Sequence, residues 1–412
     1  MEILYVLLVL LLVTKLCAEV AVRAGQPALI GELVGGVLVG LGVMLLPGSE
    51  SVIADIGSDE TFKGILDLAV FFLMLVAGLE MRPGKLAKAA WKALPVAVVG
   101  MLLPLALGIL LGWVWLPESD WKLVQSLFLG VALAITAVPV AVKVLMDLGR
   151  LESRVGQVVV AAAVLDDIFS LLLLAVLTSM ISTSEAPSVA SLGLIAVKTL
   201  LFIGIAGLAG RYLLPLLARW TRHVCVEYAE FTVVLLFGLG LAVLAEALGM
   251  HFLIGAFAAG VLFTRNTIDA KVYKRLRNQF EALTLGFFAP VFFASIGIHL
   301  DLTAAVEIPV FVAALLAFAI FGKLVGAGLA ARLSGLDGRE AVAVGAAMNA
   351  RGAVEIIIAD IALRAGLFAH PTPTPDEVRY LFSAVVIMAI VTTLMSPVMM
   401  RAALEPGESG SR

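Results

Sequence analysis

The chain has 412 residues, of which 62% are hydrophobic and 14% charged, and its formal net charge is -3. Apolar residues run along its whole length, which excludes a soluble domain carrying one anchor and indicates a polytopic membrane protein. No basic face suggests nucleic acid, and the two cysteines, Cys17 and Cys225, lack the spacing of a disulfide framework or a zinc site.

The first apolar segment, residues 3–13, resembles the core of a signal peptide. Glu2, however, stands where a cationic region should precede such a core, and Lys15 and Glu19 follow it. We therefore interpret this segment as part of a first membrane helix.

Gly, Pro and charge clusters divide the chain into about thirteen helices of membrane-spanning length. These predicted spans cover residues 3–22, 28–46, 63–80, 93–116, 123–147, 155–181, 189–215, 228–247, 251–264, 279–298, 308–331, 341–364 and 377–400. The expected fold is all-α, with a transmembrane domain over residues 1–402 and a short cytoplasmic tail over residues 403–412.

The linkers between these spans alternate in charge. Linkers 82–92 and 265–277 are rich in Lys and Arg, whereas linkers 47–60 and 372–377 are acidic or neutral. The positive-inside rule places the basic linkers in the cytoplasm, the N-terminus outside and the C-terminus inside. The odd span count also permits two inverted six-helix halves joined by the seventh span, which is the usual architecture of secondary transporters.

The fifth predicted span is interrupted near its centre by Thr136-Ala137-Val138-Pro139. Pro139 lacks an N–H group and clashes with the carbonyl of Ile135, so carbonyl groups are freed from the helix. Freed carbonyls at membrane depth are tolerated where they line a cavity, and with the Thr136 hydroxyl they could form half of a cation-binding shell. The alternative is a simple proline kink with Thr136 bonded back to its own helix.

Asp166 and Asp167 lie together in the apolar stretch 158–180. Inserting each charge into a membrane costs roughly 2.5 to 3.5 kcal/mol, so an ionisable pair at this depth indicates a functional site. Two carboxylates hold a cation when ionised and protons when neutral, which is the chemical basis of cation/proton exchange. The nearby Ser170 can face the same cavity or bond back to its own helix.

Lys323 lies too deep in the eleventh predicted span to reach an interface by snorkelling. We expect a carboxylate partner, either Asp166 or Asp167, and a lysine held in this way can lose and regain its proton. The alternative is a lysine that donates to helix carbonyls.

The twelfth predicted span carries Asn349, Arg351 and Gly352 near its centre, with Glu355 one turn later. Arg351 and Glu355 at i, i+4 form an internal pair, and a direct role of both in shaping an ion path is the alternative. Gly345 and Gly352 would let this helix loosen, as a discontinuous helix requires.

Three other acids, Glu32, Asp67 and Glu80, are weaker signals because they lie close to predicted span ends, where interfacial solvation would suffice. The four histidines lie at span ends or in loops, and we interpret them as interfacial residues.

Together these motifs resemble the cation:proton antiporter superfamily, specifically the second monovalent-cation branch with its bacterial sodium/proton antiporters. The resemblance covers most of the chain and rests on Gly25-Gln26-Pro27, Gly31-Glu32, Gly35-Gly36, Ala77-Gly78-Leu79-Glu80, Thr136-Ala137-Val138-Pro139, Asp166-Asp167, residues 255–260, Pro290-Val291-Phe292-Phe293 with Gly297, and Asn349-Ala350-Arg351-Gly352.

This resemblance implies a homodimer whose core bundle moves like an elevator against a dimerisation bundle, with the fifth and twelfth spans crossing as discontinuous helices. It implies that Asp167 is the principal ion and proton carrier. Asp166 and Lys323 match the charge-moving members of the superfamily, so electrogenic exchange is implied as well. The chain departs from the potassium efflux systems, which have Gln before the key Asp and a C-terminal nucleotide-binding domain.

The sequence therefore predicts a secondary antiporter of the cell membrane, not an enzyme, that uses no cofactor and exchanges Na+ or Li+ for protons in pH homeostasis. The predicted ion and proton ligands are Asp166, Asp167, Thr136 and Ser170, and the predicted compensating charges are Lys323, Arg351 and Glu355. K+ stays open as the cation, because ion choice depends on cavity size and ligand number.

Three other classes fit the sequence less well. An intramembrane aspartyl protease would need its two aspartates on separate helices. A channel suits adjacent acids beside a buried lysine less well than alternating access does. An ATP-driven pump would need a phosphate-binding loop that the sequence lacks.

Overall fold

The computed structural model describes residues 2–45, 60–80, 83–136, 141, 144–145, 148, 150, 153–183, 189–220, 226–263 and 270–404. Regular structure in these residues is entirely helical. Eight of the described helices are long and apolar enough to cross a membrane, and shorter apolar helices accompany them. The chain is therefore an all-α polytopic membrane protein, as its hydropathy predicts.

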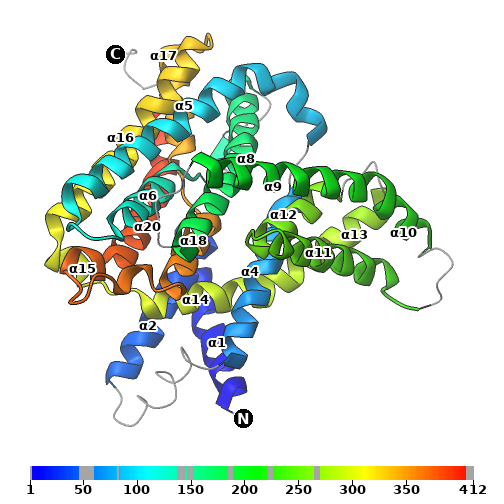
Figure 1. Ribbon diagram of the computed structural model, residues 1–412, viewed down its shortest axis with the longest axis horizontal. Coiled ribbons are helices and arrows are strands. Elements are labelled where there is room, and N and C mark those ends of the chain that lie inside the picture. Colours follow the sequence, from blue (N-terminus) through cyan, green and yellow to red (C-terminus); the bar gives the residue numbers. More distant parts are fainter. Residues whose placement is uncertain are drawn as a thin grey trace, which may run out of the picture. The chain divides into compact units, whose positions relative to one another are not determined.

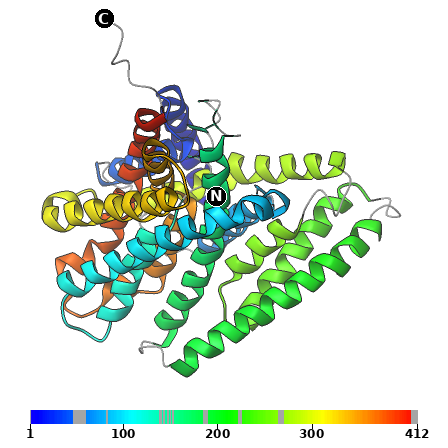
Figure 2. The same cartoon turned by 90° about the horizontal axis from the view of Figure 1, so that it is seen from above.

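The helices form two compact units, each of which combines two separate stretches of chain. Unit 1 contains Met1–Pro83 and Ser188–His299, and unit 2 contains Gly84–Pro187 and Leu300–Arg412. Figures 1 and 2 show the helices in two views, coloured along the sequence. Each unit thus draws on both the N-terminal and the C-terminal half of the chain.

Unit 1 contains membrane helices and two short π-helical segments. Its elements are α1 (Glu2–Arg23), α2 (Ala28–Leu45), α4 (Glu60–Glu80), α9 (Val189–Leu208), η1 (Ala209–Leu213), α10 (Leu214–Trp220), α11 (Ala229–Ala247), α12 (Phe252–Leu262), α13 (Ala270–Leu283), η3 (Thr284–Phe288) and α14 (Ala289–His299).

Neither π-helical segment ends the helix that contains it. The elements α9, η1 and α10 form one continuous rod (Figure 1), and α13, η3 and α14 form another. This second rod begins at Ala270, before the predicted span that starts at residue 279. Hydropathy misses α13 because that helix is polar and amphipathic rather than apolar.

Glycines bring the helices of unit 1 close together where α4 crosses α12. A Cβ atom on Gly78 of α4 would lie 2.3 Å from the carbonyl oxygen of Phe257, and one on Gly260 of α12 would lie 2.2 Å from that of Leu75. No side chain fits at either position. The glycines that carry the family resemblance in these two segments are therefore helix-contact positions.

Unit 2 contains the remaining membrane helices. Its elements are α5 (Pro83–Trp115), α6 (Lys122–Ala134), α8 (Arg154–Thr183), α15 (Ala304–Glu307), α16 (Pro309–Leu333), α17 (Gly338–Met348), α18 (Ala353–Arg364), η4 (Leu367–Ala369), α19 (Asp376–Arg379) and α20 (Leu381–Leu404). α20 ends within the predicted tail, and residues 405–412 lie outside the described residues.

Small side chains dominate the core of unit 2. Ala and Val residues of α5, α8, α16 and α17 fill most of it, and their size lets the helices approach one another closely. α5 and α16 lie side by side (Figures 1 and 2), and a Cβ atom on Gly326 would lie 2.8 Å from the carbonyl oxygen of Val99. Gly345, which we expected to loosen its helix, is helical and packs its Cα against Leu324 of α16.

Two helices of unit 2 end well inside predicted spans. α6 ends at Ala134, near the middle of the fifth predicted span. α17 ends at Met348, and α18 begins at Ala353 within the same predicted twelfth span. α17 begins at a capping box, in which Glu340 and Asp337 each accept a hydrogen bond from the other's backbone N–H. The start of α17 is thus fixed by its sequence, whereas its end at Met348 lies inside the predicted span.

Candidate functional site

The carbonyl groups at the end of α6 are bound by two cationic side chains. After Ala134 the backbone becomes extended (ψ 148°), so the last carbonyls of the helix have no partner within it. The guanidinium of Arg351 donates to the carbonyl oxygen of Leu133 at 2.8 Å and to that of Ala132. Lys323 Nζ donates to the carbonyl oxygen of Ala134. Both cations also neutralise the negative end of the α6 dipole.

The end of α17 is held by hydroxyl groups instead. Ser396 of α20 donates to the carbonyl oxygen of Ala346 at 2.7 Å. Thr136, just beyond α6, donates to the carbonyl oxygen of Met348 at 3.1 Å. Thr136 therefore ties the end of one interrupted helix to the end of the other, and it does not bond back to its own helix as the kink interpretation would require.

Between α17 and α18 the backbone is not helical, and α20 holds this segment in place. The hydroxyl of Thr393 donates to the carbonyl oxygen of Arg351 at 2.9 Å and accepts a bond from the Arg351 N–H at 3.1 Å. Asn349 is the C-terminal cap of α17, and Gly352 is the N-terminal cap of α18. The position of Arg351 is thereby fixed through its own backbone.

Asp166 of α8 faces Lys323 across a fully buried ion pair. The distance from Lys323 Nζ to Asp166 Oδ1 is 3.6 Å, and neither side chain is exposed. Lys323 also donates to Thr136 Oγ1 at 2.7 Å. Neither carboxylate oxygen of Asp166 has a hydrogen-bond partner among the described residues. The lysine thus combines the two roles that the sequence left as alternatives, because it pairs with an acid and also binds a helix carbonyl.

Arg351 also pairs with Glu355, as its i, i+4 spacing indicated. Arg351 Nη1 lies 3.4 Å from Glu355 Oε2, and both side chains are fully buried. The same guanidinium binds the carbonyls at the end of α6. Arg351 therefore both pairs with Glu355 and holds the end of α6.

The remaining predicted site residues are only partly described. Ser170 of α8 is buried, and its hydroxyl has no partner among the described residues, so it does not bond back to its own helix. Asp167 lies in α8, but its side chain is outside the described side chains. Ala137, Val138 and Pro139 lie outside the described residues.

The side chains near these helix ends carry oxygen atoms that could coordinate a small cation. Oxygen atoms of Asp166, Ser170 and Thr136 are of the kind that hard cations prefer. Within the described ranges, no group of three or more His, Cys, Asp or Glu residues could hold a resident metal ion.

Sequence reasoning underrated one pair in unit 1. Glu32 of α2 is buried rather than solvated at an interface, and its Oε1 atom lies 3.1 Å from Lys15 Nζ of α1. Lys15 also donates to the carbonyl oxygen of Leu285 in η3 at 2.7 Å. A Lys in the first span and a Glu in the second were the available signal, but their pairing depends on how two helices pack.

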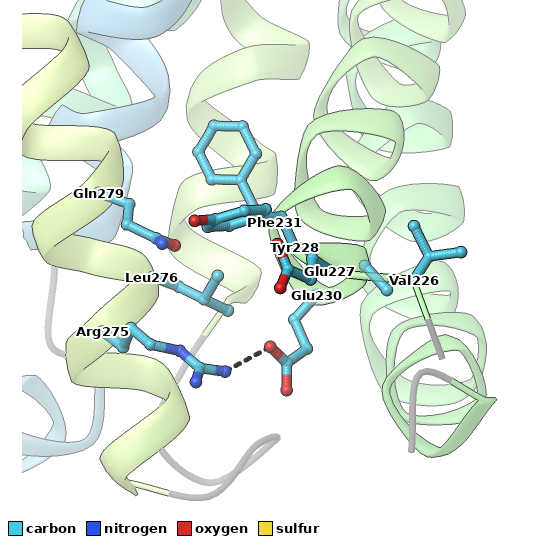
Figure 3. Close-up of a pocket in the computed structure, with 9 residues that line it drawn as sticks. Val226, Glu227, Tyr228, Glu230, Phe231, Arg275, Leu276 and Gln279 are labelled. Carbon is cyan, nitrogen blue, oxygen red and sulfur yellow. Dashed lines mark hydrogen bonds and ion pairs between the residues drawn. The ribbon is translucent and has the colours of Figure 1, made fainter. Parts of the chain in front are cut away.

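A surface pocket lies elsewhere in unit 1, between the start of α11 and α13 (Figure 3). Its volume is about 380 Å³, and its lining includes Glu227, Tyr228 and Gln279. Glu230 and Arg275 form an ion pair at its edge (Figure 3). None of the predicted site residues lines this pocket.

Comparison with known proteins gives one consistent result. Residues 7–405 match the family described as sodium/hydrogen exchanger, transmembrane. Over 400 residues the chain is 31% identical to the Na(+)/H(+)-K(+) antiporter GerN of Bacillus cereus. This match covers 97% of this chain and 96% of that protein. It is 29% identical over 401 residues to the Na(+)/H(+) antiporter of Enterococcus hirae, with 97% and 98% covered.

The fold is also similar to a solved structure. The sodium proton antiporter MjNhaP1 from Methanocaldococcus jannaschii, determined at pH 8, matches with a TM-score of 0.71 and 17% sequence identity. The match covers 98% of this chain and 97% of that one. At this identity the similarity concerns the fold.

Proposed function

Because the chain belongs to the sodium/hydrogen exchanger family, we propose that it exchanges Na+ or Li+ for protons at Asp166 and Asp167. The observation that carries this proposal is the fully buried Asp166–Lys323 pair at the ends of two interrupted helices. A carboxylate in this position binds a cation when it is ionised and a proton when it is neutral. Exchange follows because the two states exclude each other.

Lys323 gives this site a second proton. With the site empty of cation, Lys323 pairs with Asp166, and a cation that takes the carboxylate removes the lysine's partner. A buried lysine without a partner loses its proton readily. One proton from the principal carrier, Asp167, and one from Lys323 would leave for each cation that binds, so each cycle would move net charge.

The charges of Arg351 and Glu355 keep the site assembled while its occupant changes. Arg351 holds the α6 carbonyls, and Glu355 pairs with it. In this proposal the fifth span is interrupted at Ala137, Val138 and Pro139 and the twelfth at Asn349 and Gly352. The backbone groups that Arg351 binds are the carbonyls at the end of α6.

The division of the chain supports an elevator-type cycle. Unit 2 contains the fourth to sixth and eleventh to thirteenth predicted spans, and unit 1 contains the others. Two inverted six-helix halves that each contribute three spans to each unit would give this division. Unit 2, with the buried charges, would be the moving core, and unit 1 would be the dimerisation bundle of a homodimer.

The proposed orientation places the N-terminus outside the cell membrane and the C-terminus in the cytoplasm. Single cysteines placed in linkers 47–60 and 265–277, in a chain without Cys17 and Cys225, would test it on intact cells. An impermeant thiol reagent should label linker 47–60 alone. Labelling of linker 265–277 alone would show that the chain has the opposite orientation.

Potassium is the second candidate cation, because the name of GerN includes K+ as well as Na+. An aspartyl protease is not favoured, since Asp166 and Asp167 are neighbours on one helix, α8. A channel or a pump lacks a supporting observation in the described residues.

The test is transport by the purified protein in liposomes under a clamped potential, with gradients of Na+, Li+ and K+ in turn. We expect cation-dependent proton movement with Na+ and Li+. Proton movement with none of the three cations would overturn the proposal, and movement with K+ alone would replace the sodium assignment with the potassium one.

A further inference from the structure

The two interrupted helices of unit 2 end in the same group of polar side chains but with different charge compensation. The end of α6 contacts two cations, Arg351 and Lys323. The end of α17 contacts two neutral hydroxyls, from Thr136 and Ser396, in the part of the chain that the structure describes. A helix C-terminus carries a partial charge of roughly -0.5, and among the described residues no cationic side chain bonds directly to this end of α17.

Asn349 lies at that end of α17. It is the C-terminal cap of α17 (φ -84°, ψ -10°), and none of its surface is exposed. Neither its Oδ1 nor its Nδ2 atom has a hydrogen-bond partner among the described residues. Burying an amide without a partner is unfavourable. A side chain with this cost needs a reason other than packing.

The neighbourhood of Asn349 connects it to the proposed exchange site. The adjacent Met348 carbonyl accepts the bond from Thr136, Thr136 accepts a bond from Lys323, and Lys323 pairs with Asp166. Three short contacts thus join the end of α17 to the buried carboxylate. A carbonyl oxygen has two lone pairs, so Met348 retains one for a further ligand.

We propose that Asn349 is a ligand of the transported cation and helps to determine which cation is carried. Its Oδ1 atom and the Met348 carbonyl oxygen supply neutral oxygens at the negative end of α17, and Asp166 supplies the charge. This inference rests on the proposed exchange function. The cation completes the charge compensation at α17 that Arg351 and Lys323 provide at α6, and the C-terminal ends of interrupted helices are established places for Na+ in transporters.

An amide oxygen at this place affects selectivity more than turnover. Li+, Na+ and K+ differ in how many oxygen ligands they need and at what distance. Removing one neutral ligand should therefore weaken their binding unequally. Asn349 forms neither the buried ion pair nor the bonds that hold α6, so the exchange steps remain in place without it.

The experiment compares Asn349→Ala and Asn349→Asp in proteoliposomes, with Ser396→Ala as the matched control at the same helix end. For Asn349→Ala we expect the KM for Na+ to rise about tenfold, which corresponds to a lost ligand worth about 1.4 kcal/mol. The ratio of the KM for Li+ to the KM for Na+ should also change. The kcat should stay within about twofold of the native value. Asn349→Asp keeps the oxygen and should bind Na+ at least as tightly as the native chain.

Ser396→Ala should lower the thermal stability and leave the KM ratio unchanged, because it removes a bond that only supports the helix. The thermal shift that Na+ produces in detergent gives a second readout, and Asn349→Ala should reduce it. Should Asn349→Ala fail to fold, Asn349→Asp carries the test.

The two proposals fail separately. A native KM ratio together with a native Na+ shift in Asn349→Ala would overturn the ligand role of Asn349. If only Asn349→Asp folds, the added charge at a true ligand should enlarge the Na+ shift and change the KM ratio, and native values of both would overturn the role. Absence of cation-coupled proton movement in the native chain would overturn the exchange function instead.

Discussion

Among the described residues, two lysine–carboxylate pairs join different helices, one pair in each unit, and they differ in burial. In unit 1, Lys15 and Glu32 are 3.1 Å apart, and the side chains are 44% and 6% exposed. In unit 2, Lys323 and Asp166 are 3.6 Å apart, and neither is exposed. The pair with the shorter contact is thus the more accessible one.

Both lysines also bind a carbonyl oxygen at an irregular part of a helix. Lys15 binds Leu285 in the π-helical segment η3, and Lys323 binds Ala134 at the end of α6. An exposed lysine can keep its charge without its partner, because its ammonium group reaches a polar environment. A fully buried lysine cannot, so it must find another negative group or release its proton. A lysine and a carboxylate therefore form a structural tie in unit 1, and in the proposed cycle the corresponding pair in unit 2 exchanges a proton.

The largest effect that separates the pairs should be the loss of exchange on neutralising an acid of unit 2. Asp167→Asn should abolish Na+-driven proton efflux from liposomes, because the amide can bind neither a proton nor a cation by charge. Asp166→Asn should reduce the efflux or alter its charge coupling.

Glu32→Gln is the matched control, since it neutralises the acid of the other pair and should retain exchange. Membrane insertion and folding of all three variants are checked by their yield and elution as monodisperse protein. Normal exchange by Asp167→Asn would refute its role as the carrier, and loss of exchange in Glu32→Gln would remove the distinction between the pairs.

The second prediction concerns stability on removing each lysine. Lys323→Ala leaves the fully buried Asp166 carboxylate and the Ala134 carbonyl without this partner, so we expect a loss of about 3–5 kcal/mol. Lys15→Ala removes a lysine that is 44% exposed but leaves the buried Glu32 carboxylate without its partner, so the expected loss is smaller, about 1–3 kcal/mol. Reversible unfolding in mixed micelles, at a pH where the acids are ionised, measures both. Equal losses would show that burial does not distinguish the pairs.

The third prediction is that Lys323→Arg changes charge coupling while the pair persists. Arginine keeps its proton at physiological pH, so the second proton of the proposed cycle would no longer be released. Na+ uptake into liposomes, with and without a valinomycin-set K+ diffusion potential, reports this after K+ transport has been excluded. A potential supplies about 2.3 kcal/mol per elementary charge per 100 mV, so the native chain should respond and Lys323→Arg should approach electroneutral exchange. If the native chain ignores the potential, Lys323 is a structural partner of the acids.

Hydropathy and charge predicted much of the fold and the identity of the buried charges. Membrane helices are read easily from sequence because the bilayer requires long apolar runs. Asp166, Lys323 and Arg351 were equally visible, because charges in such runs are costly. The family resemblance drawn from the motifs is confirmed by the match over residues 7–405.

What the sequence could not supply is the partner of each charge. Arg351 and Lys323 share the carbonyls of α6 because α16, the segment between α17 and α18, and the end of α6 meet in space. The Lys15–Glu32 pair was missed for the same reason, because each residue alone resembles an interfacial one. α13 was missed because a polar amphipathic helix produces no hydropathy signal.

The smallest effect is expected for Lys15→Arg, which repeats in unit 1 the substitution that should alter charge coupling in unit 2. The Lys15 side chain is 44% exposed, so the longer guanidinium has room to keep its contacts with Glu32 and the Leu285 carbonyl. Lysine and arginine are both cationic side chains, and no step of the proposed cycle needs Lys15 to release a proton. We therefore expect a stability change within about 0.5 kcal/mol, as for most surface substitutions, and a native response to the membrane potential. The same liposome and unfolding measurements check it beside Lys323→Arg. A shift of Lys15→Arg toward electroneutral exchange would mean that the pair in unit 1 also exchanges protons during transport, and the contrast between the two pairs would then lie in access rather than in role.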